Sequence, residues 1–256
     1  MRIAVAGATG RLGRHVAEVL TERGHQVVAI SRATGVDIIA GSGLAAALDG
    51  AEVIVDAATS PSPEERAATE FFVTAADNLQ QAGVRAGVKR AVVVSIINTD
   101  KFSGGYGAAK IAHEDAWRSG PIPVQIIRAA QFHEFVAQLL EWGTRGDVAT
   151  VPEMRTQIVS ARAVAEVIAD TIIADTVIAG AVIAEPTAII EVAGPREENL
   201  AELARMLVAR RGTLVTVTET RDPADPDARL QATGGLLPGP GARLAGPTFA
   251  EWLDRK

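Results

Sequence analysis

Three residues in the middle of the chain have types and a spacing suited to proton transfer. Ser95 ends an apolar run, Tyr106 is the only tyrosine among the 256 residues, and Lys110 follows it by four positions. Residues four apart on a helix share a face, so we expect the Lys110 ammonium to lie near the Tyr106 phenol and to favour its ionised form. An unperturbed tyrosine has a pKa of about 10, and such a neighbour would bring it closer to the range of a general acid at neutral pH. The alternative is a solvent-exposed pair on a helix surface.

A second group of residues near the N-terminus suggests a bound nucleotide. The sequence VAGATGRLG places Gly7, Gly10 and Gly13 where an apolar run passes into an amphipathic segment. Glycines at this spacing allow a sharp strand-to-helix turn and let a pyrophosphate approach the backbone at the helix N-terminus. The pattern predicts dinucleotide binding, and the alternative is the same turn without a ligand. Further expected cofactor contacts are Thr9, Arg11, Leu12, Ala57 and Ala58.

The residues after the second apolar run bear on which dinucleotide binds. A site for NAD usually offers Asp or Glu about 20 residues after the glycines, whereas this chain has Ser31 and Arg32. A hydroxyl and a guanidinium suit the 2′-phosphate of NADP, and Arg11 would add a second charge-assisted contact. NADP is therefore favoured over NAD, although Arg32 could instead be an ordinary surface arginine. Asp37 could accept a hydrogen bond from the adenine amino group, or could cap a turn.

Alternating apolar runs and amphipathic segments predict the elements that position these residues. Strands buried on both faces of a parallel sheet are expected at 3–6, 27–30, 53–56, 91–95 and 124–128, with helices at 11–23 and 64–84. Between residues 30 and 53 there is room only for a short strand at 36–39 and a small helix at 44–48. We therefore expect an α/β fold with a Rossmann-type doubly wound parallel sheet and a small C-terminal substrate lobe.

The second half of the chain has a less regular pattern. Helices are expected at 132–144, 161–173, 200–210 and 249–253, strands at 189–192 and 214–217, and a long Pro- and Gly-rich loop at 222–247. The apolar stretch 168–184 is interrupted by two aspartates and is shorter than the ~20 residues of a spanning helix, so we interpret it as a buried helix leading into another core element. Residues 1–130 are predicted to form the dinucleotide-binding region and residues 131–256 the substrate-facing lobe, integrated into one domain.

Composition narrows the classes of partner. The net charge is -6 and the 25 Lys and Arg residues are scattered, which argues against nucleic-acid binding. The absence of cysteine excludes disulfides and thiolate ligands, and the short N-terminal apolar run predicts a cytoplasmic protein rather than a secreted or membrane-bound one.

The four histidines lack the spacing of a zinc site. His133, followed by Glu134, could line a substrate pocket, or the pair could cap a helix or face solvent.

The sequences GATGRLG and RAAQFHEF, together with Ser95, Tyr106 and Lys110, resemble the short-chain dehydrogenase/reductases, specifically their atypical NmrA-like branch. The resemblance implies that Ser95 orients a substrate carbonyl, that Tyr106 passes the proton, and that Lys110 binds the nicotinamide ribose as well as tuning Tyr106. It also implies that the loop containing Ala129 and Gln131 covers the nicotinamide. Two further correspondences are Phe132 as a wall of that site and Asn78 as part of a proton relay, unless Asn78 is merely a polar surface residue.

This resemblance implies an NADPH-dependent reductase that transfers hydride to a small carbonyl, quinone or enone, acting as a monomer or homodimer. Some members of the branch bind the cofactor without turnover, so the alternative is an NADP(H)-binding redox sensor. A third possibility is a sugar-nucleotide epimerase, which we expect to need a larger C-terminal lobe.

Overall fold

The computed structural model describes residues 1–177 and 189–255, and the chain divides into two compact units. The first unit consists of Met1–Ser95, Gly105–Arg128 and Ala165–Ile190, and the second of Ile96–Gly104, Ala129–Val164 and Glu191–Lys256. The chain passes from the first unit to the second at Arg128, close to the boundary predicted at residue 130. Before that, the chain leaves the first unit after Ser95 and returns to it at Gly105, and it returns once more at Ala165. The two units therefore alternate along the sequence.

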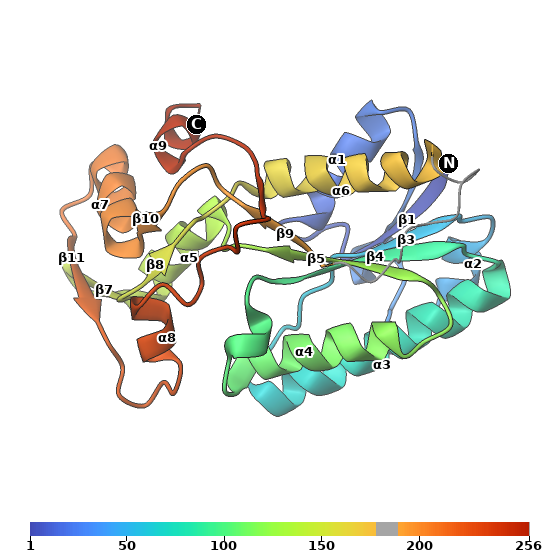
Figure 1. The fold of residues 1–256 in the computed structure, drawn as a ribbon, viewed down its shortest axis with the longest axis horizontal. Helices are drawn as coiled ribbons and strands as arrows, with labels where there is room; N and C mark the ends of the chain where they lie inside the picture. Colours follow the sequence, from blue (N-terminus) through green and yellow to red (C-terminus); the bar gives the residue numbers. More distant parts are fainter. Residues whose placement is uncertain (178–188, 256) are drawn as a thin grey trace. The chain divides into compact units, whose positions relative to one another are not determined.

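A doubly wound parallel sheet forms the centre of the fold (Figure 1), as predicted. Its strands lie in the order β12-β9-β5-β4-β3-β1-β2. Their bounds are β1 Arg2–Ala6, β2 Gln26–Ile30, β3 Val53–Asp56, β4 Arg90–Ile96, β5 Val124–Ala129, β9 Ile190–Ala193 and β12 Arg243–Leu244. The predicted strands at 3–6, 27–30, 53–56, 91–95, 124–128 and 189–192 are confirmed.

The order of the strands places a ligand-binding position at the ends of β1 and β3. The chain runs from β1 outward to the edge strand β2 and then returns to β3 on the opposite side of β1. In this register Ala6 pairs with Ile30 of β2 and with Asp56 of β3. Loops that leave adjacent strands in opposite directions open a crevice at the carboxyl edge of such a sheet, which is where α/β proteins bind ligands.

Helices cover both faces of the sheet in the first unit (Figure 1). One face carries α1, Gly13–Glu22, and the part of α6, Ala161–Val177, that begins at Ala165, whereas α2, Leu44–Leu48, α3, Glu65–Ala86, and α4, Gly105–Arg118, lie on the other. The helix α3 begins where the Glu64 carboxylate accepts hydrogen bonds from the backbone N–H groups of Arg66 and Ala67. It ends at Gly87, whose φ of 75° is the left-handed value that commonly terminates helices. The helices predicted at 11–23, 44–48 and 64–84 are therefore confirmed.

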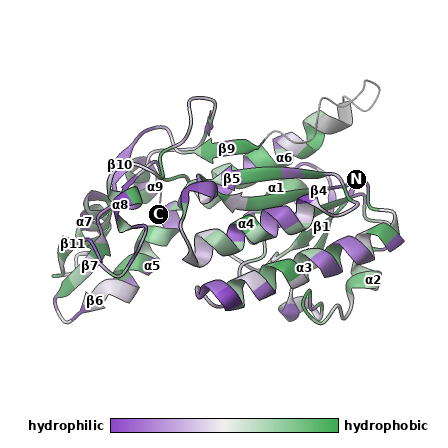
Figure 2. Ribbon diagram, turned by 60° about the horizontal axis from the view of Figure 1, so that its bottom comes forward, coloured by the Kyte–Doolittle hydropathy of each residue, from purple (hydrophilic) through white to green (hydrophobic). Residues whose placement is uncertain are grey.

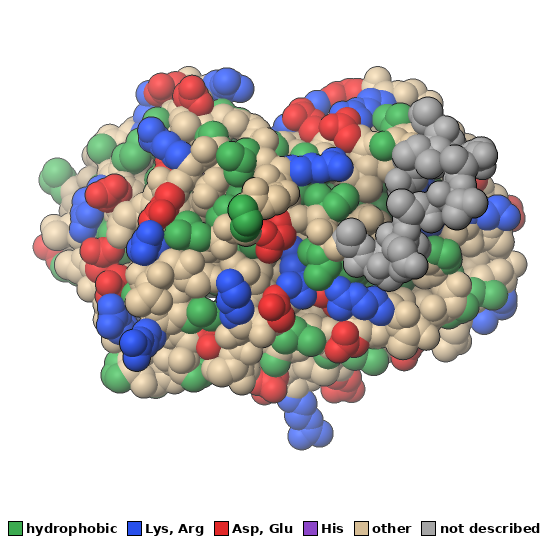
Figure 3. All heavy atoms as spheres, viewed as in Figure 1, with side chains coloured by type: hydrophobic (Ala, Val, Ile, Leu, Met, Phe, Trp, Pro, Cys, Tyr) green, Lys and Arg blue, Asp and Glu red, His purple; other side chains and the backbone are tan. Residues whose placement is uncertain are grey.

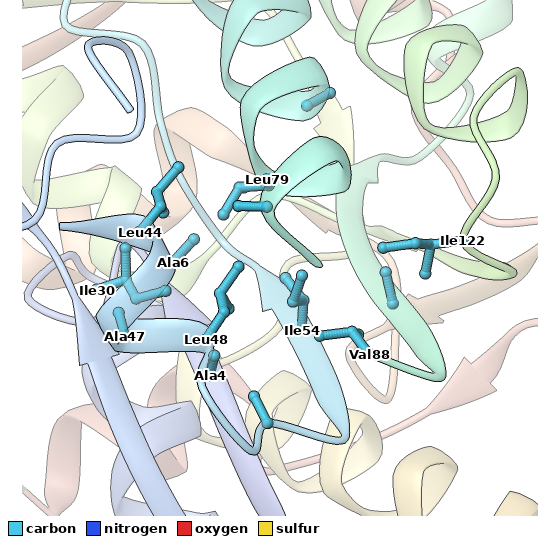
Figure 4. Packing of buried hydrophobic residues seen from close by; sticks show 14 of the residues in the cluster. Ala4, Ala6, Ile30, Leu44, Ala47, Leu48, Ile54, Leu79, Val88 and Ile122 are labelled. Atoms are coloured by element: carbon cyan, nitrogen blue, oxygen red, sulfur yellow. The ribbon is translucent and has the colours of Figure 1, made fainter. Parts of the chain in front are cut away.

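Alternate residues of each strand build the core beneath α2 and α3. Ala4 and Ala6 of β1 and Ile54 of β3 point into a cluster with Leu48 of α2 and Leu79 of α3 (Figure 4). Intervening strand residues such as Ile3 and Val5 are also fully buried, because side chains alternate between the two covered faces of a sheet. Figure 2 accordingly shows mostly apolar strands, whereas α3 has polar residues on part of its surface.

The strand predicted at 36–39 is wrong. After β2 the chain forms a short 3-10 helix, η1, Arg32–Thr34, and then turns, and none of residues 36–40 belongs to a strand. The Asp37 carboxylate accepts hydrogen bonds from the backbone N–H groups of Ile39 and Ala40, at 2.8 and 3.1 Å. An aspartate that binds its own backbone in this way competes with strand pairing, so β2 remains at the edge of the sheet.

The second unit is built around a separate cluster of apolar side chains. Val136 and Leu140 of α5 pack there with Leu203 of α7 and with Phe249 and Leu253 of α9. The helices of the second unit are η2 Thr99–Lys101, α5 His133–Gly143, α7 Leu200–Arg211, α8 Ala228–Ala232 and α9 Phe249–Asp254, and the first residues of α6 also belong to this unit. Its short strands outside the central sheet are β6 Thr144–Arg145, β7 Val148–Pro152, β8 Arg155–Thr156, β10 Glu198–Asn199 and β11 Thr216–Thr220. The helices predicted at 132–144, 161–173, 200–210 and 249–253 are confirmed.

Two predictions in this unit need correction. The predicted loop at 222–247 contains α8 and β12. In the turn before α8, the Asp225 carboxylate accepts a hydrogen bond from the Asp227 N–H at 2.9 Å. The strand predicted at 214–217 begins only at Thr216, and Leu214 is 96% exposed. Of the predicted buried stretch 168–184, the part from 178 onward lies outside the described residues.

The described residues contain no helix with the length and apolar character that crossing a bilayer requires. On the face drawn in Figure 3, Lys and Arg side chains are interspersed with Asp and Glu.

Candidate functional site

The glycine-rich turn joins β1 to α1 at the carboxyl edge of the sheet. Gly7 has a φ of 74°, and a Cβ built on it would lie 2.7 Å from the Ala57 carbonyl oxygen. A Cβ on Gly13 would lie 2.1 Å from the Gly7 carbonyl oxygen. Gly7 and Gly13 are thus required by the tight turn and by the close approach of α1 to it. Gly10 differs, since it is exposed and a Cβ added to it would meet only the Gly7 carbonyl oxygen, at 3.1 Å.

The N-terminus of α1 has the properties of an anion-binding site. Thr9, Gly10 and Arg11 are exposed, whereas Leu12 is buried and takes the N-cap position without a side-chain hydrogen bond. The first turn of α1 carries no acidic side chain. The positive end of the helix dipole is therefore available to a phosphate.

The segment after β2 lies beside this turn. Gly7 N–H donates to the Ile30 carbonyl at 3.0 Å, which ties the glycine turn to the end of β2. Ser31 caps η1 by accepting a hydrogen bond from the Thr34 N–H at 3.3 Å, and Arg32 is exposed at the start of η1. The backbone N–H groups of Ala40 and Ile39, with a smaller effect of Arg32, lower the pKa of Asp37. Asp37 thus caps a turn, which was the alternative that the sequence left open.

Asn78 of α3 holds the same turn in place. Its side-chain amide donates to the carbonyls of Ile38 and Ile39 at 2.9 and 2.8 Å. In the structure, the Asn78 side chain therefore fixes the turn after β2. This is neither of the two roles that the sequence suggested, which were part of a proton relay and a plain polar surface residue.

Tyr106 lies in the first turn of α4. The N–H of Gly105, which has a φ of 62°, donates to the Glu65 carboxylate at 2.7 Å and so joins the start of α4 to the start of α3. The ring of Tyr106 meets the edge of Phe72, with their centroids 5.7 Å apart. Burial raises the pKa of Tyr106 to about 12, and a backbone hydrogen bond from Ser60 only partly offsets this.

Lys110 is directed into the protein interior. Its ammonium donates to the Val94 carbonyl at 2.7 Å, lies 2.9 Å from His113 Nδ1 and sits 4.3 Å from the centre of the Phe72 ring. The prediction that Lys110 favours the ionised form of Tyr106 is therefore wrong for this structure, since the pKa of Tyr106 is raised and the ammonium binds other groups. Both residues nevertheless contact the same Phe72 side chain.

His113 connects Lys110 to a buried carboxylate. His113 Nε2 lies 2.9 Å from Asp56 Oδ2, which also accepts a hydrogen bond from the Trp117 indole at 3.0 Å. Burial alone would raise the pKa of Asp56, but His113, the Ala58 N–H and Lys110 together lower it. Burial is the main cause that lowers the pKa of His113, and the nearby charge of Lys110 lowers it further. At neutral pH the group therefore consists of a carboxylate, a neutral imidazole and an ammonium.

Ser95 lies at the end of β4, beside a second buried ion pair. Glu114 of α4 binds Arg128 of β5 through two hydrogen bonds of 2.9 and 3.0 Å and binds Arg118 at 2.9 Å. Burial alone would raise the pKa of Glu114, but Arg128 and the Ser95 hydroxyl lower it. Ser95 is only 3% exposed, and its hydroxyl lies near the Glu114 carboxylate without meeting the geometry of a hydrogen bond.

The remaining predicted residues belong to the second unit. Ala129 accepts a hydrogen bond from the Ile97 N–H at 3.0 Å, and the Gln131 side chain accepts one from the Thr156 hydroxyl at 2.6 Å. Phe132 caps α5. His133 is fully buried against Phe249 and Trp252, so the prediction that it lines a pocket is wrong. Glu134 accepts a hydrogen bond from Ala161 N–H at 3.3 Å and so caps α6.

Sequence reasoning missed Asp56, His113 and Trp117. The signal was present, because Tyr106, Lys110, His113 and Trp117 are separated by four, three and four residues and therefore form one stripe on a helix. Asp56 was the single charged residue in an otherwise apolar strand, which is a position where a carboxylate needs a partner.

A comparison with known families identifies the fold's relatives. The family model described as NAD(P)H-binding matches residues 7–175, which includes the glycine turn and all of α4. The chain belongs to this NAD(P)H-binding family. The predicted resemblance to atypical, NmrA-like short-chain dehydrogenase/reductases is confirmed.

Among curated proteins, the Photosystem II assembly factor Ycf39 of Synechocystis sp. is 28% identical over 116 residues, which make up 40% of this chain and 36% of that protein. The matched region thus spans about a third of this relative's length.

Solved structures of low sequence identity share the whole fold. The dTDP-4-dehydrorhamnose reductase of Bacillus anthracis in complex with NADP has a TM-score of 0.69 and 17% identity, with 99% of this chain and 97% of that chain covered. A short-chain dehydrogenase/reductase superfamily protein from Agrobacterium tumefaciens with bound NAD has a TM-score of 0.64 and 17% identity, covering 100% and 95%. The UDP-N-acetylglucosamine 4-epimerase of Bacillus cereus has a TM-score of 0.69 and 16% identity, covering 100% and 94%. The chain has the Rossmann-type fold of these proteins.

Proposed function

We propose that this protein is an NADPH-dependent oxidoreductase that reduces a small carbonyl, quinone or enone, with Tyr106 as the proton donor. The observation that carries the proposal is the glycine turn at the switch point of the sheet, where Gly7 and Gly13 allow no side chain and Gly10 is open to solvent. A cradle of this kind fits a pyrophosphate. The NADP-bound reductase of the same fold supports the choice of reaction class.

The cofactor, when bound, supplies the hydride. The N-terminus of α1 would hold the pyrophosphate, with Ala57 and Ala58 on the opposite side of the turn. Lys110 would bind the nicotinamide ribose, as the family resemblance implies. Asp37 is now proposed to shape the adenine end through its turn rather than to bind adenine directly.

The proposed preference for NADP rests on Arg32. Its guanidinium is exposed beside Ser31 at the end of β2, where a 2′-phosphate would accept charge-assisted hydrogen bonds. We expect Arg32→Gln to weaken NADPH binding by about tenfold and to leave NADH binding within about twofold. Isothermal titration with both nucleotides measures this, and Arg85→Gln, which removes an exposed arginine from the last turn of α3, is the control. Equal effects on both nucleotides would contradict the 2′-phosphate contact.

The raised pKa of Tyr106 favours reduction over oxidation. A phenol with a pKa of about 12 stays protonated at neutral pH, so it is ready to donate a proton to the alkoxide formed by hydride transfer but is a poor base toward an alcohol. Tyr106→Phe should abolish NADPH consumption with a carbonyl panel while leaving the NADPH dissociation constant within about threefold. Turnover by the Phe variant at the parent rate would remove Tyr106 from the reaction.

A second candidate is an NADP(H)-binding redox sensor without turnover. It is favoured by the environment of Ser95 and Lys110, which contact Glu114 and His113 inside the protein rather than Tyr106. It predicts nucleotide binding, no turnover across the panel, and a protein partner whose recovery depends on the redox state of NADP(H). An epimerase is not excluded by size, contrary to our expectation, because this chain covers 94% of the Bacillus cereus epimerase.

A further inference from the structure

We infer that Asp56 and His113 are positioning residues for Lys110, and that through it they set the affinity of the site for the nicotinamide nucleotide. The inference rests on the proposed function, in which Lys110 contacts the cofactor. It concerns two residues outside the predicted Ser95, Tyr106 and Lys110 group, both from the buried part of the first unit.

The contacts form one continuous chain from β3 to β4. Asp56 Oδ2 lies 2.9 Å from His113 Nε2, His113 Nδ1 lies 2.9 Å from Lys110 Nζ, and that ammonium donates to the Val94 carbonyl at 2.7 Å. Asp56 and His113 are fully buried, and Lys110 is 4% exposed. A group enclosed in this way has few alternative hydrogen-bond partners, so its geometry is strongly determined.

The hydrogen bonds fix which imidazole nitrogen carries the proton. An ionised Asp56 can only accept, so His113 Nε2 is the donor to it, and the neutral ring then presents Nδ1 as an acceptor. The Lys110 ammonium can only donate, and Nδ1 receives it. Each donor therefore meets an acceptor, and the imidazole transmits the orientation of the carboxylate to the ammonium.

Packing holds the imidazole in this orientation. The ring of Phe72 stacks on His113 with a centroid distance of 4.7 Å and an interplanar angle of 28°, and the same ring lies below the Lys110 ammonium. The Trp117 indole, one turn further along α4, donates a separate hydrogen bond to Asp56 Oδ2 at 3.0 Å and does not contact Lys110. Residues of β3, α3 and α4 thus act together on the position of Lys110.

The same carboxylate reaches the glycine turn. Asp56 Oδ1 accepts a hydrogen bond from the Ala58 N–H at 3.1 Å, and the Ala57–Ala58 segment is the one that would meet a Cβ on Gly7. Asp56 therefore connects the segment proposed to contact the pyrophosphate with the lysine proposed to contact the ribose. A carboxylate that had only to balance a buried lysine would not need this second contact.

The experiment exploits the different shapes of two amides. Asparagine places its carbonyl oxygen near the position of His Nδ1, whereas glutamine places its amide near Nε2. His113→Asn keeps an acceptor for Lys110 and His113→Gln keeps a contact to Asp56 instead. Trp117→Phe is the matched control, since it removes the other donor to Asp56 Oδ2 without touching Lys110.

We expect His113→Gln and Lys110→Met each to weaken NADPH binding by about tenfold, because each removes a hydrogen bond that involves a charged group. The variants His113→Asn and Trp117→Phe should change NADPH binding by less than about threefold. Combining His113→Gln with Lys110→Met should weaken binding no further than Lys110→Met alone, because His113 acts through Lys110. A purely structural role would give additive losses.

A second readout needs no nucleotide. The chain has four lysines, so the Cε resonance of Lys110 can be assigned with the Lys110→Met variant and followed through a pH titration. The charged and titratable groups that act on Lys110 are Asp56 of β3 and His113 and Glu114 of α4, with Arg128 of β5 paired to Glu114. Tyr106 contacts the Phe72 ring that also lies against the ammonium. His113→Gln should move the Lys110 midpoint to lower pH, because the ammonium loses an acceptor, whereas Trp117→Phe should leave it in place.

The outcomes separate this inference from the proposed function. If the parent protein binds NADPH and the His113→Gln variant binds it with equal affinity, only the positioning role is overturned. Additive losses of affinity in the double variant would overturn it in the same way. Loss of affinity in His113→Asn equal to that in His113→Gln also overturns it, since Asn keeps the acceptor. Parent protein that binds neither NADPH nor NADH overturns the proposed function and the inference with it.

Discussion

Gly13 and Gly24 illustrate two different reasons for a glycine. A Cβ on Gly13 would press to 2.1 Å of a backbone oxygen, whereas Gly24 has a φ of 79° and open space around it. We expect Gly13→Ala to lower the free energy of unfolding by about 3 kcal/mol through overpacking and Gly24→Ala by about 1 kcal/mol through backbone strain alone. Urea denaturation of both variants measures the difference, and equal losses would show that the turn can relax.

Lys110 makes the stability of the protein depend on pH in an unusual direction. Burial lowers its pKa to about 8, although Asp56 and Glu114 act in the opposite sense. An unfolded lysine has a pKa of about 10.4, so between these values the unfolded chain binds more protons than the folded one and stability rises with pH. The difference in unfolding free energy between parent and Lys110→Met should therefore grow in favour of the parent from about pH 7.5 to 9.5. A flat difference in denaturant titrations would contradict the lowered pKa.

Single residues also mark the limit of what the sequence could predict about the site. The spacing of Gly7, Gly10 and Gly13 was sufficient because backbone geometry there depends on local residues. The contact between His113 and Asp56 was not predictable from spacing, because the two residues are 57 positions apart and meet only through the packing of the sheet. Tyr106 and Lys110 share a helix face as expected, but the rotamer of a lysine follows the nearest acceptors, here Val94 and His113.

At the scale of elements, short helices depend on their caps. Thr248 accepts a hydrogen bond from the Glu251 N–H at 3.3 Å, and the Glu251 carboxylate accepts one from the Thr248 N–H at 2.9 Å, which is a capping box at the start of α9. We expect Thr248→Ala to cost about 1 kcal/mol of stability and Thr248→Ser to cost little. Thermal denaturation compares them, and an equal loss in both variants would assign the effect to the Thr methyl group.

Elements with a strong periodic pattern were predictable, and those decided by local hydrogen bonds were not. The strands of the central sheet are covered on both faces and read as unbroken apolar runs. Residues 36–39 have a similar apolar character, but the Asp37 side chain and the Asn78 amide bind the backbone groups that a strand would need. The helix α8 was missed because its five residues lie within a Pro- and Gly-rich stretch, a composition that predicts a loop.

At the scale of the whole molecule, the proposed nucleotide contacts at residues 7–13, 31–37 and 57–58 all lie in the first unit. We expect NADPH at about 100 times its dissociation constant to stabilise the folded protein by about 2.7 kcal/mol. In hydrogen exchange, protection should be greatest at residues 7–13, 31–37 and 57–58. Adenosine 2′,5′-bisphosphate, which lacks the pyrophosphate and nicotinamide, is a control that should protect 31–37 more than 7–13. Protection confined to the second unit would contradict the assignment of the site.

The alternation of the two units along the chain has a consequence for synthesis on the ribosome. The first unit contains Met1–Ser95 and Gly105–Arg128 but also Ala165–Ile190. The part of the sheet face that α6 covers beside α1 therefore stays open until residues 165–177 have been synthesised. A nascent chain in this state is a natural client for a chaperone such as those that shield exposed apolar surface. The same arrangement means that no continuous gene fragment encodes either unit by itself.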